Sequence, residues 1–179
     1  MAIPLEKISS TVHSYLEAHP GESASLEPLL DALAKGFDFT SRRRFPAHIT
    51  AGVVLINPRQ QVLQVHHRRL GRWLHPGGHC EPADKSLPGT ALRELAEECG
   101  VRPEDIEPIG GEDALPVQID VHAIPAAGSR GEPAHRHFDF RFAYRAPVDL
   151  QVTVGTEAVS HRWKPLLELG DSVLAARLG

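Results

Sequence analysis

The sequence predicts an α/β fold in which helices cover the faces of a mixed β-sheet. Apolar runs rich in β-branched residues, typical of strands, stand both before and after a segment with helical periodicity. Of the 179 residues, 41% are hydrophobic and 23% charged, which indicates a globular chain rather than a disordered one. A chain of this length can bury a core without covalent cross-links, so we expect one main domain with a small appendage.

The appendage comes first. Residues 1–36 are expected to form two short helices, because apolar residues recur there at helical spacing on both sides of a His-Pro-Gly break. Residues 37–46 form a connector whose three consecutive arginines are typical of a solvated turn. We therefore divide the chain into a helical extension and connector, residues 1–45, and a main domain, residues 46–179.

The main domain is expected to begin with a hairpin. A strand from His48 to Ile56, a turn at 57–60 and a strand at 61–66 follow one another, and the stretch 68–80 is a loop rich in Gly, Pro, Trp and His. The remaining elements are a helix at about 88–99, strands at about 116–124, 136–145 and 157–164, and a helix at 171–178.

Charge and cysteine content restrict the function classes. Nineteen basic against 23 acidic residues give a net charge of −4, so a general nucleic-acid-binding surface is not expected. Two cysteines without a CxxC pair favour a reducing, cytoplasmic setting. Neither a signal peptide nor a membrane span is expected, because no basic segment precedes an apolar run at the start and no apolar stretch reaches 18 residues. The chain also contains 11 histidines, which could make its charge strongly pH-dependent.

The predicted helix at 88–99 carries a cluster of carboxylates. Glu94, Glu97 and Glu98 are expected on the face opposite an apolar stripe, where like charges at these spacings repel one another. A solvated acidic face is one interpretation, and a site for a hard divalent cation is the other. Gly77 and Gly78 before the helix favour the cation site, because glycine lets the backbone approach an ion or a phosphate closely.

This segment resembles the signature of the Nudix hydrolase family. Residues 93–101 match the second half of that signature at every specified position. The first half departs twice: Asp84 replaces a glutamate, and eight residues instead of seven separate it from Arg93. The resemblance extends to the strand pair upstream, to Trp73 and Pro76 before the glycines, and to the segment from Glu157 to Trp163 downstream, so it covers roughly residues 46–170.

The resemblance implies an α/β/α sandwich and an Mg²⁺-dependent enzyme, with Mn²⁺ as the alternative ion. Such an enzyme would hydrolyse a diphosphate linkage in a nucleoside diphosphate derivative or similar small molecule. The sequence itself leaves both a monomer and a homodimer open. Arg93 would orient the helix carboxylates. The metal ligands would be Glu94, Glu97, Glu98 and the Gly77 carbonyl, and the supporting acidic shell would be Glu81 and Asp84.

The proton acceptor and the reaction class stay open at this point. Glu97 or Glu94 is expected to be the general base, with Glu157 in reserve because some members of the family use a downstream loop. A non-hydrolytic ligand-sensing domain is the alternative function. A diphosphate isomerase is less favoured, because it would need a reactive thiol and both Cys80 and Cys99 are expected to be passive.

A second group of polar residues lies on two predicted strands joined by the loop 125–134. Because side chains alternate along a strand, the members on each strand face one side, and they would converge if the strands paired. A substrate-binding surface, an accessory metal site and a solvated sheet face are the three interpretations. Arg68, Arg69 and His79 are further substrate candidates. The second group consists of Asp120, His122, His135, His137 and Asp139, and all of these except Asp120 are counted as substrate-binding candidates.

Overall fold

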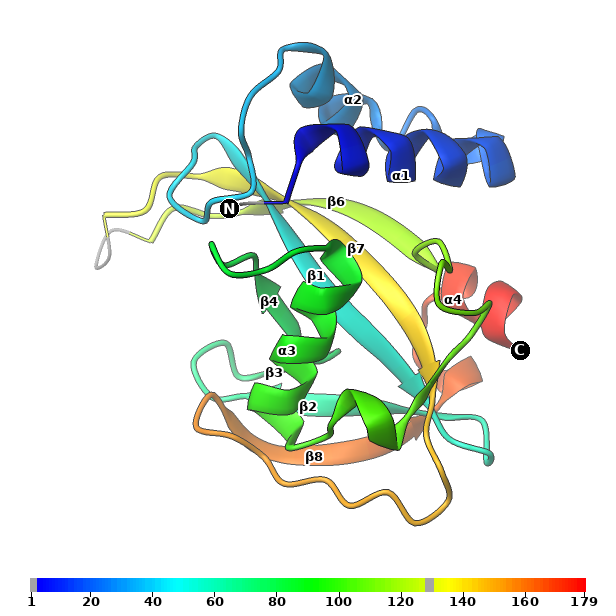
Figure 1. Cartoon of the computed structure of the whole chain (residues 1–179). Helices are drawn as coiled ribbons and strands as arrows, with labels where there is room; N and C mark the ends of the chain where they lie inside the picture. Colours follow the sequence, from blue (N-terminus) through cyan, green and yellow to red (C-terminus); the bar gives the residue numbers. More distant parts are fainter. Residues whose placement is uncertain (1–2, 128–130) are drawn as a thin grey trace.

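The computed structural model describes residues 3–127 and 131–179, and it places helices on both faces of a central sheet (Figure 1). The helices predicted from the sequence are confirmed within a few residues. Single turns of 3₁₀-helix cover Pro20–Glu22, Pro103–Asp105 and Leu166–Glu168. The α-helices are α1 (Leu5–Ala18), α2 (Glu27–Ala34), α3 (Leu87–Cys99) and α4 (Ser172–Leu178).

The sheet is mixed, as predicted. Its two long central strands, β1 and β7, run parallel over their whole length, while the other pairings are antiparallel. β6 pairs with the other edge of β7, and β2 carries both β3 and β8. The strands are β1 (Ala47–Ile56), β2 (Gln61–His67), β3 (Arg72–Leu74), β4 (Gly77–His79), β5 (Glu107–Pro108), β6 (Gln118–Ile124), β7 (His135–Arg145) and β8 (Ala158–Pro165).

Two details differ from the sequence prediction. β1 and β2 pair only beside their turn, at Ile56 and Val62, because β4 occupies the same edge of β1 farther along. The stretch 68–80 was expected to be a loop, but it contains β3 and β4. β4 has no strand pattern in the sequence because two of its three residues are glycines. Its pairing with β1 requires glycine, since a Cβ on Gly77 would lie only 2.6 Å from the Cα of Gly52.

The two faces of the sheet differ in character. On one face Ile49 and Ala51 of β1 lie beside Phe138 and Phe140 of β7, and this apolar surface packs in one buried cluster with side chains of α1, α2 and α3. On the other face, the end of β1 near Ile56 is apolar and packs with α4 in a second cluster. The opposite end of that face carries histidines and carboxylates instead, so the fold leaves a polar region there.

The N-terminal extension is tied to the rest of the chain through Tyr15. Its buried hydroxyl donates to Glu22 at 2.5 Å and accepts hydrogen bonds from the Ile119 N–H and the Arg177 guanidinium. Arg177, on α4, also pairs with Glu22.

The division of the chain at residue 45 stays a prediction. In the described part of the chain, no helix has both the length and the apolar character needed to cross a membrane.

Candidate active site

Local signals define the ends of α3, the helix that carries the acidic residues. Ser86 caps its start, since the side-chain Oγ accepts a hydrogen bond from the Gly89 N–H at 3.1 Å. Gly100 ends it in the left-handed conformation at φ +65°, which confirms the stop expected from the sequence. Residues 153–155 then cover the last turn, with Gly155 and Thr153 donating to its final carbonyls at 2.8 Å. This contact holds the loop before Glu157 against α3.

The three glutamates of α3, which we call the acidic cluster, do not share one solvated face. Glu97 is exposed and Glu94 half-buried, but Glu98 is only 7% exposed. The interpretation of the cluster as a solvated acidic face is therefore wrong for Glu98. The helical rotation places this side chain beside β4, where its Oε2 accepts a hydrogen bond from the Gly77 N–H at 3.0 Å.

Burial changes the protonation of this cluster. It raises the pKa of Glu98 to about 7, with further contributions from Glu94, Glu157 and Glu97 against the opposing Gly77 hydrogen bond. Burial also raises the pKa of Glu94, although Arg93 counteracts it. Because a bound cation would offset the charge that makes these carboxylates unfavourable, the donor set suits a divalent metal ion.

Arg93 connects the acidic cluster to the loop before the helix. Its guanidinium donates to both carboxylate oxygens of Asp84 at 3.1 Å, to Glu94 at 3.1 Å and to Glu97 at 3.0 Å. It also donates to the carbonyl oxygen of His79 at 2.8 Å. These contacts support the orienting role proposed for Arg93, since one planar group holds α3 against β4.

Asp84 occupies a defined position despite the extra residue between it and Arg93. The carboxylate is buried and accepts hydrogen bonds from the Glu81 N–H at 2.8 Å and the Thr90 hydroxyl at 2.9 Å. Burial alone would raise its pKa, but Arg93 and these donors outweigh that effect and lower it. Glu81 is exposed. The additional residue between Asp84 and Arg93 therefore leaves this contact intact, and Asp84 still reaches Arg93.

The glycines before α3 give a prediction that separates site geometry from folding. A Cβ on Gly78 would lie 2.5 Å from the Glu94 carboxylate, whereas one on Gly77 would meet the backbone of β1. We expect Gly78→Ala to displace the flexible Glu94 side chain and lower turnover at least about tenfold while the melting temperature changes little. Gly77→Ala should lower the melting temperature. Equal thermal losses in both variants, measured by calorimetry, would contradict this prediction.

The remaining candidates beside α3 differ in how they are held. Arg68 donates to the carbonyls of Thr156 and Ala158 at 3.0 and 3.1 Å, so it supports the loop that carries Glu157. The Glu157 side chain is 74% exposed, with its nearer carboxylate oxygen 4.0 Å from His67 Nε2. Arg69 lies exposed in the following turn. The Glu157 carboxylate is therefore exposed to solvent, whereas the guanidinium of Arg68 is already engaged.

The polar group expected on two strands does converge. β6 and β7 pair antiparallel, with His122 opposite His137 and Asp120 opposite Asp139. β1 adds His48 and β4 adds His79, which complete what we call the histidine cluster: His48, His79, His122, His135 and His137. Sequence analysis missed His48 as a member. Its alternation with Thr50, which bonds Asp139, was the available signal.

The carboxylates beside the histidine cluster are occupied by neighbouring groups. Asp139 accepts hydrogen bonds from the Thr50 hydroxyl at 2.8 Å and from Arg141 Nε at 2.9 Å, and an Asp120 carboxylate oxygen lies 2.9 Å from His122 Nδ1.

His75 lies near Asp139 and Arg141, and its buried Nδ1 has no hydrogen-bond partner among the described residues. Burial lowers the pKa of His75 to about 4, so the ring is neutral. A polar ligand atom could satisfy this nitrogen.

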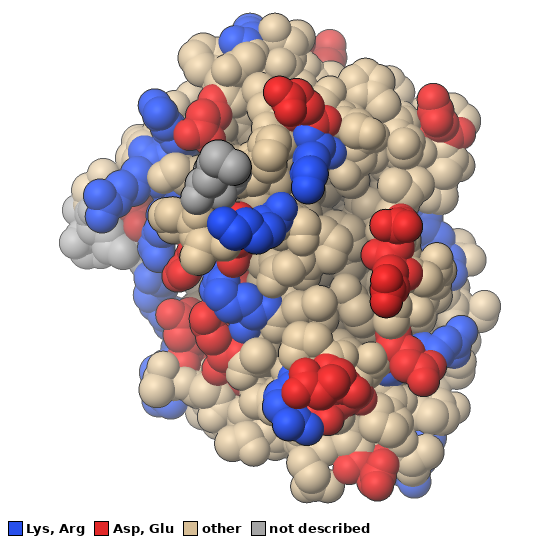
Figure 2. Space-filling view, viewed as in Figure 1, with Lys and Arg blue, Asp and Glu red and all other residues tan. Residues whose placement is uncertain are grey.

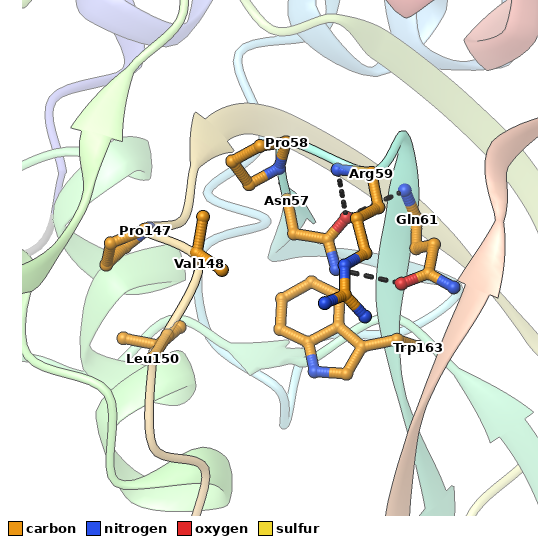
Figure 3. A pocket seen from close by; sticks show the side chains of 8 residues that line it. All are labelled: Asn57, Pro58, Arg59, Gln61, Pro147, Val148, Leu150 and Trp163. Atoms are coloured by element: carbon orange, nitrogen blue, oxygen red, sulfur yellow. Dashed lines mark hydrogen bonds between the residues drawn. The ribbon is translucent and has the colours of Figure 1, made fainter.

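One hollow of about 130 Å³ lies elsewhere on the surface (Figure 3). It forms beside the β1–β2 turn, where Asn57 holds Gln61 through a side-chain hydrogen bond of 3.0 Å. None of the α3 carboxylates lines it, so it is not the site described above. Its lining residues are Asn57, Pro58, Arg59, Gln61, Pro147, Val148, Leu150 and Trp163.

Comparison with known proteins decides the family. The model of the NUDIX domain matches residues 46–178. The chain belongs to the Nudix family. A curated relative, the RNA pyrophosphohydrolase of Roseobacter denitrificans, is 30% identical to this Nudix chain over 138 residues, which cover 73% of this chain and 84% of the relative. As a member of the family, the protein is a hydrolase of diphosphate (pyrophosphate) bonds.

Solved structures agree on the fold of this Nudix protein. The Caenorhabditis elegans Ap4A hydrolase in a binary complex has a TM-score of 0.53 at 19% identity, over 66% of this chain and 80% of that one. The Escherichia coli dihydroneopterin triphosphate pyrophosphohydrolase has a TM-score of 0.53 at 18% identity, over 72% and 84%. The expected Nudix-type sandwich is therefore confirmed.

Proposed function

We propose that this Nudix hydrolase uses Mg²⁺, with Mn²⁺ as the alternative ion, to cleave a diphosphate linkage in a small nucleotide-derived molecule. The observation that carries the proposal is the buried Glu98 carboxylate, which accepts a hydrogen bond from the Gly77 N–H. The carboxylates of Glu94 and Glu97 are near enough to raise its pKa. All the side chains in this donor set offer oxygen atoms, which Mg²⁺ prefers. The metal ligands we propose are Glu94, Glu97, Glu98 and the carbonyl of Gly77.

When bound, the ion would offset the charge of the diphosphate and make a water molecule more acidic for attack on phosphorus. The chain's own groups supply the rest. Glu97 and Glu94 are the proposed acceptors of the water's proton, since one is exposed and the other half-buried beside Arg93. Arg93 keeps both carboxylates in place. Glu157, on the loop held by Arg68, is the reserve base.

Features beyond α3 support parts of this proposal. His79, His122 and Asp139, together with the neutral His75, form a polar region near β4 that we propose as part of the substrate-binding surface. Burial raises the pKa of Cys80 to about 11, and that of Cys99 to about 12, so neither is a ready thiolate. This disfavours an isomerase that depends on a reactive cysteine.

We also propose a cytoplasmic setting and a small-molecule substrate. Both cysteines are unpaired, as in a reducing compartment. On the face shown in Figure 2, basic and acidic side chains are interspersed, which supports a surface without general affinity for nucleic acid. A single RNA end could still bind as a substrate, and the curated relative is named for such an activity.

The test is a substrate panel assayed for phosphate-containing products with and without Mg²⁺. The panel holds nucleoside triphosphates, dinucleoside polyphosphates, nucleotide sugars, isoprenoid diphosphates and an RNA with a 5′-triphosphate. We expect turnover of at least one nucleotide-derived member and its loss when EDTA removes the ion. Binding without turnover would favour a ligand-sensing domain, and rearrangement of an isoprenoid diphosphate would favour an isomerase; either result would contradict the proposal.

A further inference from the structure

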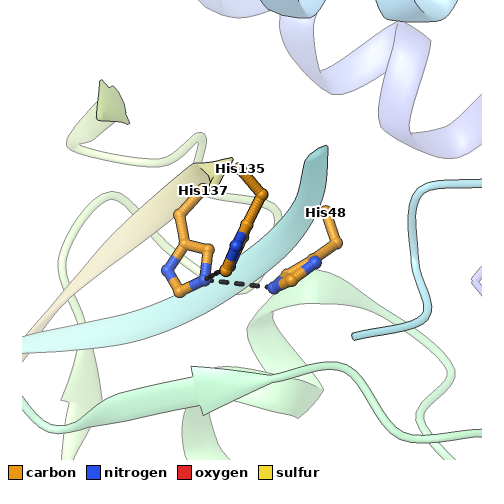
Figure 4. A group of neighbouring side chains, drawn as sticks. All are labelled: His48, His135 and His137. Atoms are coloured by element: carbon orange, nitrogen blue, oxygen red, sulfur yellow. Dashed lines mark hydrogen bonds between the residues drawn. The ribbon is translucent and has the colours of Figure 1, made fainter. Parts of the chain in front are cut away.

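The histidine cluster places several imidazole nitrogens unusually close together. His48 Nε2 and His137 Nε2 are 3.1 Å apart, and His135 Nε2 and His137 Nε2 are 3.3 Å apart (Figure 4). The ligand atoms of these three residues all lie within 4.8 Å of one another. His48 and His135 are 2% and 8% exposed, so the group is enclosed by protein rather than spread over a surface.

Backbone carbonyls determine which nitrogen of His48 and of His135 carries hydrogen. His48 Nδ1 lies 3.1 Å from the carbonyl of Arg44, and His135 Nδ1 lies 2.8 Å from that of Pro133. A carbonyl oxygen only accepts, so each Nδ1 donates, and the Nε2 of each neutral ring keeps a lone pair. Both lone pairs are directed toward His137.

Hydrogen bonding within the protein cannot satisfy this arrangement fully. His137 Nε2 carries at most one hydrogen, and it faces two nitrogen acceptors. A metal cation can accept all three lone pairs at once, and it binds neutral imidazole.

We propose that His48, His135 and His137 form a binding site for a transition-metal ion of the zinc class, separate from the acidic cluster on α3. In a tetrahedral zinc site, ligand nitrogens about 2.0–2.1 Å from the ion lie about 3.3–3.4 Å from one another. The separations of 3.1 and 3.3 Å are close to this spacing. Imidazole ligands select such ions, while oxygen ligands like those on α3 select Mg²⁺.

The surroundings match those of a metal site. The Nδ1–H bonds to carbonyls are the outer contacts that usually orient histidine ligands. The ring centroid of His79 lies 5.0 Å from that of His48 and 5.2 Å from that of His137. The ring centroid of His122 lies 5.5 Å from that of His137. Either residue, or a water molecule, could therefore complete the coordination. Phe45 covers the outer side, with its ring 5.3 Å from that of His135.

The three ligands come from segments far apart in sequence. His48 is the second residue of β1, while His135 and His137 lie at the start of β7, so an ion would join the beginnings of the two parallel central strands. It would also immobilise the Arg44 and Pro133 carbonyls, which belong to the connector and to the β6–β7 loop. We therefore assign the site a structural role, in which it holds the end of the sheet next to β4.

The test uses the full chain without a polyhistidine tag, stripped of metal by a chelator and titrated with Zn²⁺ against a chromogenic competitor. We expect one zinc per chain and a higher melting temperature with zinc than without. His48→Ala and His137→Ala should each weaken zinc binding at least about 100-fold. His161→Ala, which removes an exposed histidine of β8, is the matched control and should bind as the wild type does.

Glu98→Gln separates this site from the proposed Mg²⁺ site, because it should retain zinc binding even if hydrolysis is lost. Substitution of Co²⁺ into the unmutated protein gives a readout that survives any folding failure of the variants. We expect the strong visible absorption of tetrahedral Co²⁺. The proposal is overturned if the wild type binds no zinc, if binding persists in folded His48→Ala and His137→Ala, or if Co²⁺ gives only the weak octahedral spectrum.

Discussion

Replacing Glu98 with glutamine should remove nearly all Mg²⁺-dependent hydrolysis. The amide cannot supply the anionic oxygen that a hard cation needs, so we expect kcat/KM to fall by about 10³-fold on the best substrate of the panel. The fold should survive, since an amide oxygen can still accept the Gly77 N–H. Glu168→Gln, at an exposed position distant in sequence, is the control and should keep full activity.

The same variant should change how the metal-free protein responds to pH. In the unfolded chain Glu98 ionises at its ordinary pKa of 4.5, whereas in the folded protein it holds its proton up to about 7. Between these values the folded state binds more protons, so this residue makes the free energy of unfolding decrease as pH rises. Urea titrations from pH 5 to 7.5 should show that decrease in the wild type and a flatter profile in Glu98→Gln. A profile identical in both proteins would contradict the account of Glu98.

Replacing Arg93 with methionine should reduce both stability and activity. The substitution keeps an unbranched apolar stem but removes the guanidinium, which leaves the buried Asp84 without its charge partner and frees Glu94 and Glu97. Breaking a buried pair in this way costs about 3 kcal/mol of unfolding free energy. Adding Asp84→Asn should recover part of that loss, because it removes the unpaired charge.

Arg102→Met is the matched control for this prediction. Arg102 also pairs with two carboxylates, Glu104 and Asp105, but it lies exposed at the surface. Solvent-exposed ion pairs contribute little to the free energy of unfolding, so the denaturant midpoint of this variant should stay near that of the wild type. If Arg93→Met and Arg102→Met had the same midpoint, the connecting role of Arg93 would be wrong.

Much of the fold could be predicted because its signals are local. Ser86 and Gly100 mark the ends of α3 by capping chemistry, and alternation along residues 118–124 and 135–145 predicts both strands and the face they share. β4 could not be predicted, since its glycines carry no periodic pattern. Its pairing with β1 depends on the close approach of Gly77 to Gly52, which is a tertiary contact.

The candidate site shows the same limit. The residues of the acidic cluster were found by their spacing, yet the burial of Glu98 depends on where β4 packs against α3. His48 was not placed with the other histidines, because it stands at the start of an apolar strand and its neighbours come from β7 through parallel pairing. Parallel partners are distant in sequence, so no local pattern reveals them.

The most direct test of the account is Mn²⁺ binding measured by electron paramagnetic resonance, comparing the wild type with a Glu94→Gln, Glu97→Gln and Glu98→Gln triple variant. Mn²⁺ prefers oxygen ligands, and His48→Ala serves as a control for the histidine cluster. We predict that the wild type and His48→Ala bind Mn²⁺, that Mg²⁺ displaces it, and that the triple variant does not bind. Undiminished, Mg²⁺-displaceable binding in the triple variant would contradict the claim that the α3 carboxylates hold the ion for hydrolysis.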